Sequence, residues 1–179
     1  RANSIVDSFL NLAQLGDQPP DTNLEDISCI FNEALDEVQA VHKVESDSVE
    51  ISPLGEAFCD RDLIRQVAVN LLTNAVKYAR PDQLLKISVD ARRIHDRLKI
   101  TVADNGVGVP DDIRDTLFEP RIRGKGERDR APEGIGLGLA LCKAIITAHG
   151  GEISAEAHEG QGARFAFTLP LAQPGLQIY

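Results

Sequence analysis

The sequence predicts an α/β protein, a two-layer sandwich in which a mixed, mostly antiparallel sheet of about five strands carries helices on one face. The first reason is order, because segments with helical periodicity are interleaved with pairs of short segments that alternate like strands. The second is composition, since 179 residues that are 42% hydrophobic and 26% charged fit one globular unit with a sizeable core. Aromatic residues make up only 4%, so we expect an aliphatic core.

Two helices are predicted before the first strand. Residues Ala2–Leu15 show a short amphipathic pattern that ends at Gly16–Pro20, a segment with the composition of a hinge linker. Thr22 and Glu25 have the spacing of a capping box, and the apolar stripe after them predicts a helix over about residues 24–43.

Six short segments alternate like strands and fall into three pairs separated by polar or glycine-containing turns. They are Val49–Ile51 and Ala57–Cys59, Lys86–Ala91 and Arg97–Ala103, and Glu152–Ala157 and Ala163–Leu169. Between the second and third pairs, Leu139–His149 has helical periodicity and is followed by Gly150 and Gly151, which predict its end.

The stretch Asp62–Ala79 is the helix around which we expect the rest to be organised. It is apolar on most sides, but four polar side chains fall on one narrow stripe: Gln66, Asn70, Asn74 and Lys77. Two amide oxygens one turn apart can coordinate a hard cation, and the lysine one turn further can meet a phosphate. The alternative is a core helix whose asparagines satisfy buried backbone groups.

Two glycine segments follow this helix. Asp104–Pro110 closes a strand-like run, and Gly134–Gly138 opens the helix-like run Leu139–His149. Glycines let the backbone approach a ligand closely, and a helix start after them presents unpaired N–H groups to an anion. The G-x-G-x-G spacing matches neither a Rossmann fingerprint nor a Walker loop.

Four boxes therefore occur in order: N-L-L-x-N-A-x-K-Y (Asn70–Tyr78), D-N-G-x-G (Asp104–Gly108), F-E-P (Phe118–Pro120) and G-x-G-L-G-L (Gly134–Leu139). Over about residues 44–170, this set resembles the catalytic ATP-binding (CA) domain of bacterial two-component sensor histidine kinases, in the GHKL superfamily shared with gyrase, Hsp90 and MutL. The resemblance implies the Bergerat (GHKL) fold, ATP and Mg²⁺ as ligands, and a protein-histidine kinase that is inactive without its acceptor domain.

The resemblance also implies roles for individual residues. Asp104 would accept the exocyclic amine of adenine, although a turn-capping aspartate is the alternative for D-N-G. Asn74, and after it Asn70, would bind the metal, while Lys77 would neutralise phosphate oxygens and Tyr78 would pack near the base or ribose. The remaining positions expected to bind nucleotide are Gly106, Gly108, Arg121, Arg123, Gly134, Gly136, Leu137, Gly138 and Leu139.

The segment between Pro120 and Gly134 is dense in charge and glycine, and by resemblance it is the ATP lid. Arg123 occupies the arginine of the family's F-x-R element and would stabilise charge on the transferred phosphoryl group. Two positions depart from the family pattern, because Arg121 stands where a second Phe packs and Ile135 replaces a Thr or Ser.

The predicted reaction is γ-phosphoryl transfer to a histidine rather than hydrolysis. Gyrase-like relatives place a glutamate base where this chain has Asn70, and an amide cannot take a proton from water. We therefore expect Asn70, Lys77 and Arg123 to be the catalytic residues. A GHKL ATPase, an anti-sigma-type serine kinase and a noncatalytic binding module are the alternatives.

The four histidines are predicted to be structural or surface residues rather than phosphate acceptors. His158 precedes a glutamate, as family acceptors precede an acidic residue, but it lies in a predicted hairpin turn. His149 ends a helix, where an imidazolium would suit the helix dipole. The acceptor is thus expected on a dimerisation domain of the same kinase that is absent from this chain, with a response regulator receiver domain as an indirect partner.

Charge and cysteine content narrow the function classes further. Residues 1–60 carry 13 acidic and two basic side chains, which predicts a solvated or partner-facing acidic surface and no nucleic-acid binding. Cys29, Cys59 and Cys142 lie far apart among apolar neighbours, so we expect three reduced core thiols in a cytoplasmic protein. The sequence contains no apolar run of about 18 residues, so we expect neither a membrane span nor membrane contact from it. Anchoring of the parent protein in an inner membrane stays open.

The chain begins at Arg1, so we expect it to be a piece of a longer protein. By resemblance, residues 1–20 would be the end of a dimerisation helix and a linker. Residues 21–171 would be the kinase domain, and residues 172–179 would be a tail.

Overall fold

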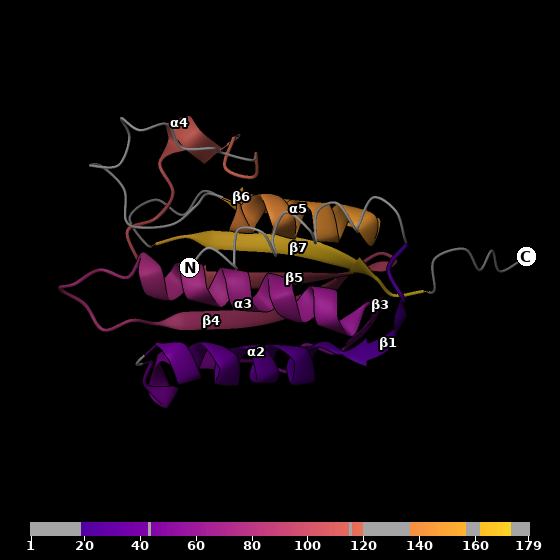
Figure 1. The fold of residues 1–179 in the computed structure, drawn as a ribbon, viewed down its shortest axis with the longest axis horizontal. Helices are drawn as coiled ribbons and strands as arrows, with labels where there is room; N and C mark the ends of the chain where they lie inside the picture. Colours follow the sequence, from indigo (N-terminus) through magenta and orange to yellow (C-terminus); the bar gives the residue numbers. More distant parts are fainter. Residues whose placement is uncertain (1–18, 43, 115, 120–136, 157–161, 173–179) are drawn as a thin grey trace, which may run out of the picture.

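The secondary structure follows the predicted alternation of helices and strands, although the first two predicted strands, Val49–Ile51 and Ala57–Cys59, lie in different sheets and do not pair with each other. The computed structural model describes residues 19–42, 44–114, 116–119, 137–156 and 162–172. Its strands are β1 (Asn23–Asp26), β2 (Val49–Ile51), β3 (Glu56–Cys59), β4 (Ile87–Ile94), β5 (Arg97–Asp104), β6 (Ile153–Glu156) and β7 (Arg164–Pro170). Its helices are α2 (Ile27–Val41), α3 (Arg61–Lys77), α4 (Asp111–Arg114) and α5 (Gly138–Ala148), with a 3₁₀ turn, η1 (Ser46–Ser48) (Figure 1).

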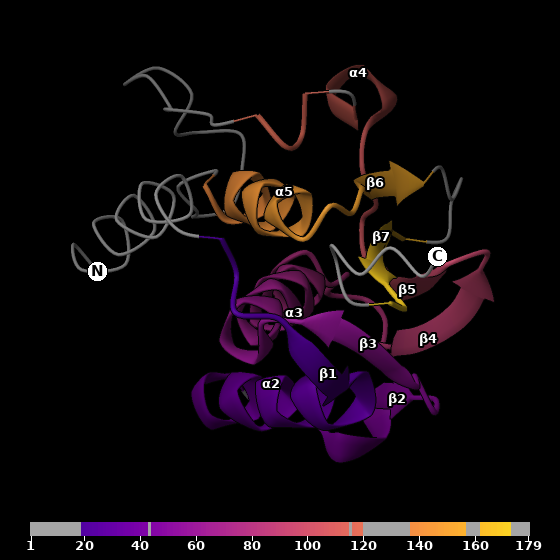
Figure 2. The same ribbon diagram turned by 90° about the vertical axis from the view of Figure 1, so that its right-hand side faces the viewer.

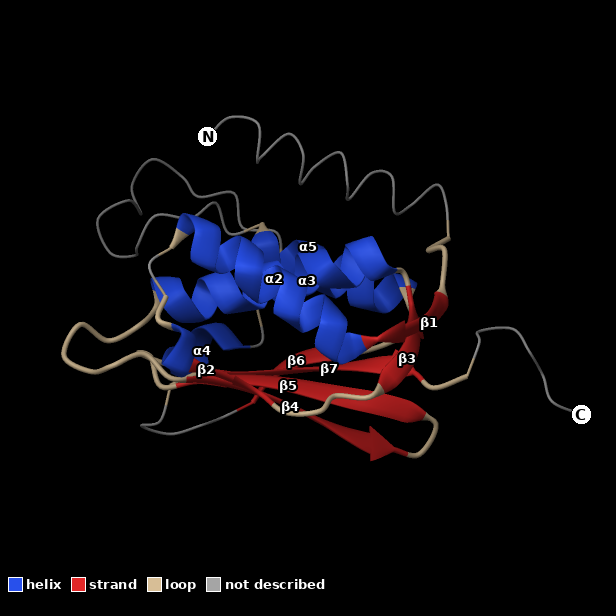
Figure 3. Ribbon diagram, turned by 90° about the horizontal axis from the view of Figure 1, so that it is seen from below, coloured by secondary structure: helices blue, strands red, loops and turns tan. Residues whose placement is uncertain are grey.

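The main sheet has five strands in the order β2-β4-β5-β7-β6. Strand β2 runs parallel to β4, and the other neighbouring pairs are antiparallel, so the sheet is mixed and mostly antiparallel as predicted. Helices α2, α3 and α5 lie together on one face of this sheet (Figure 3). The predicted two-layer α/β sandwich is therefore confirmed.

Figure 2 shows these three helices on one side and the strands of the sheet on the other. The core is made of buried side chains from both layers. On β4, Ile87 and Val89 are buried, whereas Ser88 and Asp90, which alternate with them, are exposed, which is the pattern of a strand covered on one face. The ring of Phe31 on α2 stacks on that of Phe167 on β7 with 6.5 Å between centroids. Most of the other buried side chains are aliphatic, as expected from the composition.

The start of α2 differs from the prediction. Residues Asn23–Asp26 form β1, which pairs antiparallel with β3 in a separate two-stranded sheet. The helix begins at Ile27, and its N-cap is Asp26, whose carboxylate accepts hydrogen bonds from the backbone N–H groups of Ser28 (2.8 Å) and Cys29 (3.3 Å). The predicted capping box at Thr22 and Glu25 is therefore wrong.

Helix α3 occupies almost the whole predicted stretch. It begins at Arg61 because the Asp60 side chain caps the N–H of Leu63 at 3.2 Å, and it ends at Lys77 with Tyr78 as C-cap. Three glutamates of the acidic N-terminal part are paired by two α3 arginines. Arg61 bonds Glu25 (2.8 Å) and Glu33 (2.6 Å), and Arg65 bonds Glu37. These ion pairs link α3 to α2 and β1.

The turn predicted between the second pair of strands and the helix end predicted at Gly150 and Gly151 are both present. Strands β4 and β5 form a long hairpin whose turn contains His95 at a positive φ of 55°. Helix α5 ends at Ala148, and Gly150 follows with φ 67°, a left-handed conformation that favours glycine after a helix. β4 extends three residues beyond its predicted end at Ala91, and the short helix α4 was not predicted.

Several predictions fall outside the described residues. These are the helix over Ala2–Leu15, the lid between Pro120 and Gly134, His158 and most of the turn before β7, and the tail from residue 173. Of the three cysteines, all unpaired, Cys59 and Cys142 are buried as expected, but Cys29 is exposed near the start of α2, so its assignment to the core is wrong.

Candidate functional site

The polar stripe of α3 forms one edge of the candidate site. Gln66, Asn70, Asn74 and Lys77 are all half-buried, whereas the apolar residues Val67, Leu71 and Ala75 beside them are buried in the core. Lys77 lies in the last turn of the helix, where its positive charge complements the helix dipole. Its Nζ is 5.0 Å from the ring centroid of Tyr78, so the predicted pair sits together at the end of α3.

The D-N-G segment after β5 packs directly against this end of α3. The Val107 N–H donates to the carbonyl oxygen of Tyr78 at 3.0 Å. Gly106 lies so close that a Cβ on it would be 2.4 Å from the same carbonyl oxygen. Only glycine can come this close to the Tyr78 carbonyl, so the contact with the end of α3 requires the first glycine of the D-N-G box.

The side chain of Asp104 holds the same segment in place through hydrogen bonds to two backbone groups. Its side chain is 8% exposed, and Oδ1 accepts hydrogen bonds from the N–H groups of Gly106 (2.8 Å) and Ala163 (3.1 Å). The turn-capping role considered for this aspartate is therefore present. Because the second bond reaches the start of β7, the carboxylate also joins two segments that are 59 residues apart.

A second contact joins the D-N-G segment to the start of β7. Gly162 has φ 96°, and a Cβ on it would lie 2.0 Å from the carbonyl oxygen of Asp104. Gly108, with φ 81°, packs against the Gly162 carbonyl oxygen, which a Cβ would meet at 3.1 Å. Gly108 and Gly162 therefore pack against each other where the D-N-G segment meets the start of β7.

The start of α5 meets the polar stripe of α3, which is called the asparagine edge from here on. A Cβ on Gly138, the first residue of α5, would lie 2.8 Å from Oδ1 of Asn70. The N-cap, Leu137, is buried and provides no side-chain hydrogen bond to the first turn. The N–H groups of that turn are therefore the type of donors that bind anions at helix starts.

The structure thus brings most of the predicted residues into one neighbourhood. Asn70, Asn74, Lys77 and Tyr78 lie along and at the end of α3, with the Asp104–Gly108 segment packed against Tyr78 and the Leu137–Leu139 segment packed against Asn70. Arg121, Arg123, Gly134 and Gly136 lie outside the described residues.

Three neighbours of this site were missed from the sequence. Arg80 donates from Nε to the carbonyl oxygen of Gly106 at 2.9 Å. Gly162 and Ala163 form the contacts with Asp104 described above. A glycine directly before a predicted strand was a visible signal for Gly162, whereas a side chain that bonds a remote backbone carbonyl, as Arg80 does, leaves no pattern in the sequence.

Asn105 holds the loop between α3 and β4 in place. Its Oδ1 accepts from the Lys86 N–H and its Nδ2 donates to the Leu84 carbonyl oxygen, both at 2.8 Å. The second residue of the D-N-G box therefore fixes the chain that leaves α3.

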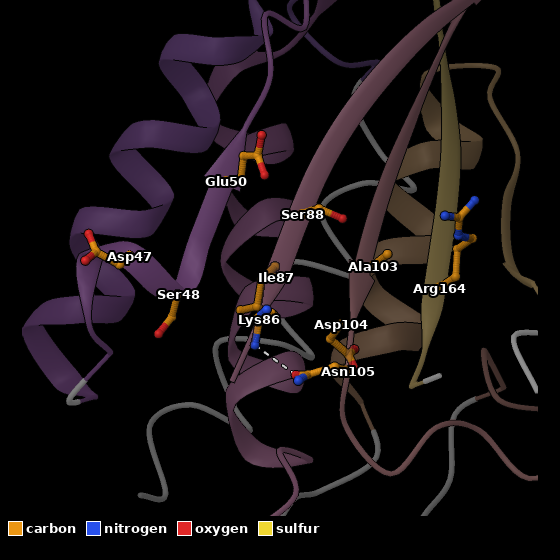
Figure 4. A pocket seen from close by; sticks show the side chains of 10 residues that line it. All are labelled: Asp47, Ser48, Glu50, Lys86, Ile87, Ser88, Ala103, Asp104, Asn105 and Arg164. Atoms are coloured by element: carbon orange, nitrogen blue, oxygen red, sulfur yellow. Dashed lines mark hydrogen bonds between the residues drawn. The ribbon is translucent and has the colours of Figure 1, made fainter. Parts of the chain in front are cut away.

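A shallow depression of about 460 Å³ lies beside this site, on the outer face of the sheet (Figure 4). Ser88, Ala103 and Arg164, which are aligned on neighbouring strands, form its floor, and Asp47 and Glu50 lie at its side. Ser88 points away from the helices because Ile87 and Val89 point toward them. Ser88, Ala103 and Arg164 therefore place most of the depression on the outer face, while Asp104 and Asn105 also line it, so that it borders the D-N-G segment of the candidate site.

A buried histidine lies at the other end of the helices. His149 is 3% exposed, and burial lowers the pKa of its imidazole despite the hydrogen bond to the Ile145 carbonyl. Its Nε2 accepts from the N–H of Asp60 at 3.0 Å, so Nδ1, 2.7 Å from the Ile145 oxygen, carries the proton. The ring is neutral, and the expected imidazolium at this helix end is wrong.

The two buried cysteine thiols are unreactive. Burial raises the pKa of Cys59 to about 12 and that of Cys142 to about 12, so neither is a thiolate at neutral pH. Within the described residues there is no group of three or more His, Cys, Asp or Glu side chains arranged to hold a metal. Among these residues, no helix has the length and apolarity needed to cross a membrane.

Comparisons with known proteins agree with this arrangement. Residues 59–173 match the family described as histidine kinase-, DNA gyrase B-, and HSP90-like ATPase. The adaptive-response sensory kinase SasA of Gloeothece citriformis is 40% identical over 129 residues, which are 72% of this chain and 32% of that protein. The sensor protein kinase WalK of Staphylococcus aureus is 33% identical over 171 residues, 93% of this chain and 41% of that protein.

Solved structures give the same fold. Full-length ShkA in complex with AMPPNP superimposes with a TM-score of 0.75 and 29% identity, covering 95% of this chain and 36% of that one. The histidine kinase AdeS of Acinetobacter baumannii has a TM-score of 0.73 at 21% identity, covering 96% and 79% of the two chains. The present chain spans about a third of the length of the first curated relatives it matches.

Proposed function

Because this chain belongs to the family of histidine kinase-, DNA gyrase B- and HSP90-like ATPases, we propose that it is the ATP-binding catalytic domain of a sensor histidine kinase. It would bind Mg-ATP and transfer the γ-phosphoryl group to a histidine on a dimerisation domain. The curated relatives at 33–40% identity are named as sensor kinases, which supports this choice within the family.

One observation carries the proposal: the asparagine edge of α3 contacts both glycine segments. Its C-terminal end bonds the D-N-G segment through Tyr78 and Val107, and its middle touches the start of α5 through Asn70 and Gly138. A ligand lying along this edge would have a carboxylate at one end and the N–H groups of the first turn of a helix at the other. ATP has complementary groups, an amine on its base and an anionic triphosphate.

We infer one direction for ATP in the site from this geometry. Adenine would lie at the D-N-G segment, where the Asp104 carboxylate is already held in position by its two backbone donors. A carboxylate can accept a hydrogen bond from the exocyclic amine of adenine. The carbonyl oxygen that guanine has at this position cannot donate one. The triphosphate would then run along α3 past Tyr78 and Lys77 toward the first turn of α5.

The donor set fits Mg²⁺. Asn74 and Asn70 are half-buried amides one turn apart on the polar edge, and neutral oxygen ligands suit a hard cation that keeps most of its waters and binds phosphate oxygens. When bound, the ion would neutralise charge on the triphosphate. Asn74 is proposed as the main protein ligand and Asn70 as the second, while Lys77 would supply positive charge beside the phosphates.

The residues of the lid complete the proposal. Arg123 would stabilise charge on the phosphoryl group in transit, with Arg121 beside it, and Gly134 and Gly136 would extend the phosphate-binding backbone that Gly138 begins. Their roles rest on the family resemblance of the sequence.

Phosphoryl transfer fits the polar edge better than hydrolysis does. Asn70 stands where gyrase-like relatives carry a glutamate base, and its amide cannot deprotonate water. An acceptor imidazole needs no such base, because its unprotonated nitrogen attacks the γ-phosphorus directly while ADP leaves. The catalytic roles of Asn70 and Lys77 would be orientation and charge stabilisation.

The proposed function requires other domains. We infer that residues 21–171 form the kinase domain, preceded by the end of a dimerisation helix in residues 1–20 and followed by a tail in residues 172–179. The direct partner would be the dimerisation and phosphoacceptor domain of the same kinase. A response regulator receiver domain would then take the phosphoryl group from that histidine.

The test is incubation with ATP labelled on its γ-phosphate, with and without a helical acceptor domain supplied as a separate chain. Acid-labile label on the acceptor histidine is the expected result, with little free phosphate when no acceptor is present. Rapid phosphate release without an acceptor would instead identify an ATPase. Absence of ATP binding would identify a noncatalytic module.

A further inference from the structure

A single peptide unit of the D-N-G segment is held at both ends by the chain that leaves α3. The carbonyl oxygen of Gly106 accepts a hydrogen bond from Arg80 Nε (2.9 Å), and the N–H of Val107, in the same peptide unit, donates to the Tyr78 carbonyl (3.0 Å). Two bonds in opposite directions fix the plane of this peptide against rotation. The partner of the Val107 N–H is a backbone carbonyl, and the partner of the Gly106 carbonyl is the Arg80 side chain. A substitution can therefore remove only the bond from Arg80.

We propose that Arg80 is a positioning residue for the adenine end of the site, acting through this peptide rather than by contact with the nucleotide. The inference rests on the proposed function, since it assigns Arg80 a part in the ATP binding proposed above. The link to the ligand is short: the Gly106 residue whose carbonyl Arg80 holds also donates its N–H to Asp104 Oδ1 at 2.8 Å.

The local sequence prepares Arg80 for this contact. It follows Ala79 just after the helix C-cap, and Pro81 comes next. A proline restricts the backbone of the residue before it to extended conformations, which limits the directions that the Arg80 side chain can take. The side chain is half-buried, and a guanidinium Nε–H donates in a fixed plane.

The rest of the fold does not depend on this bond. β5 is paired along its whole length with β4 and, from Arg97 to Ala103, with β7, and Asp104 is bonded to Ala163 independently of Arg80. Removal of the Arg80 side chain should therefore loosen the Gly106–Val107 peptide without opening the sheet. The effect should appear in recognition of the base and not in recognition of the phosphates.

Arg93 provides a matched control. It also donates from Nε to a backbone carbonyl, that of His95 at 3.0 Å, in the turn between β4 and β5. That turn is at the end of β5 opposite to the D-N-G segment. Arg80→Ala and Arg93→Ala thus remove the same type of bond and the same charge at opposite ends of one hairpin.

The experiment measures the affinities of the 179-residue chain and both variants for Mg-ATP and for inorganic triphosphate with Mg²⁺. Arg80→Ala should weaken ATP binding about tenfold and triphosphate binding less than twofold, because only the base loses its positioned partner. Arg93→Ala should leave both unchanged. Equal losses of ATP and triphosphate in Arg80→Ala, or no loss of either, would overturn the proposal.

A second measurement separates this proposal from the proposed function. Amide hydrogen exchange of Val107 without nucleotide should be faster in Arg80→Ala than in the wild type and in Arg93→Ala. Unchanged exchange would show that Arg80 does not hold the Gly106–Val107 peptide. If the wild type bound no ATP, the proposed function would fail together with the positioning role, while the exchange rates would still show whether Arg80 holds the peptide.

Discussion

The side-chain oxygen of Asn70 occupies the space beside Gly138 so closely that a Cβ on this glycine would lie 2.8 Å from it. The two residues are 68 positions apart in the sequence, one in the middle of α3 and the other at the first position of α5. Their contact brings the asparagine edge to the glycine segment that is expected to bind phosphate.

Gly138→Ala tests this contact. Because the atom in the way is the end of a half-buried side chain, Asn70 should turn aside and the helices should stay in place. We expect ATP affinity to fall about tenfold with little change in melting temperature, since alanine is a better helix former than glycine. Calorimetric titration and thermal unfolding measure the two effects. In a Gly138→Ala, Asn70→Ala double variant the two losses should be clearly less than additive, whereas simple addition would argue against the contact.

Asn74→Ala tests the metal assignment. The amide oxygen is expected to bind Mg²⁺, so its loss should reduce Mg-dependent ATP affinity by at least about tenfold and leave the weak affinity measured in EDTA unchanged. Asn32→Ala on α2 is the control, because it removes the same side chain from an exposed position of another helix. Unchanged affinity with Mg²⁺ in the folded Asn74 variant would refute the assignment.

Asp104→Asn tests base recognition. The asparagine keeps an oxygen that can accept from the N–H groups of Gly106 and Ala163, so the turn should persist. Loss of the negative acceptor should cost about 1–3 kcal/mol of ATP binding, and binding of inorganic triphosphate should change by less than twofold. If both ligands lost affinity equally, Asp104 would be only a turn residue. Competition titrations with ATP and triphosphate distinguish these results.

His149 predicts a pH dependence of stability. Burial lowers its folded-state pKa below the ordinary value of 6.5, so the unfolded chain binds more protons than the folded chain between these two pKa values. The stabilisation is fully present above about pH 6.5 and is lost as the pH falls toward the folded pKa, with a slope of at most about 1.4 kcal/mol per pH unit. Urea unfolding between pH 7.5 and 5.5 measures it.

His149→Gln is the informative variant for this pH dependence. Glutamine carries no titrating ring, so the slope of unfolding free energy against pH between 7.5 and 5.5 should flatten even if the variant is less stable overall. His42→Gln at the C-cap of α2 is the control and should keep the wild-type slope. A slope that survives in His149→Gln would show that another group produces it.

The sequence was informative wherever the period of burial was regular. β2 coincides with the predicted Val49–Ile51, and α3 lies within one residue of its predicted start, because alternating and helical patterns mark elements covered on one side. β1 was missed because most of its four residues are exposed and its strand conformation depends on pairing with β3, about 30 residues later. Capping chemistry could not decide between Thr22 and Asp26 without that pairing.

The site was predictable to a similar degree. Its boxes located Asn70, Asp104 and Gly138, since glycines and amides at fixed spacings carry chemical meaning. The bonds that join the boxes were not predictable, because the Tyr78 carbonyl and the Gly106–Val107 peptide are backbone groups that every residue has. His149 was misjudged for a related reason, as its burial against Asp60 depends on the packing of α5 beside the start of α3.

The central claim is that three separated segments form one ATP site on the helical side of the sheet. The most direct measurement is a titration of the isotope-labelled chain with Mg²⁺ and a non-hydrolysable ATP analogue, followed through backbone amide signals. The account predicts that Asn74, Gly106 and Leu139 shift together with one dissociation constant. Shifts confined to Ser88, Ala103 and Arg164, around the depression on the outer face, would contradict it.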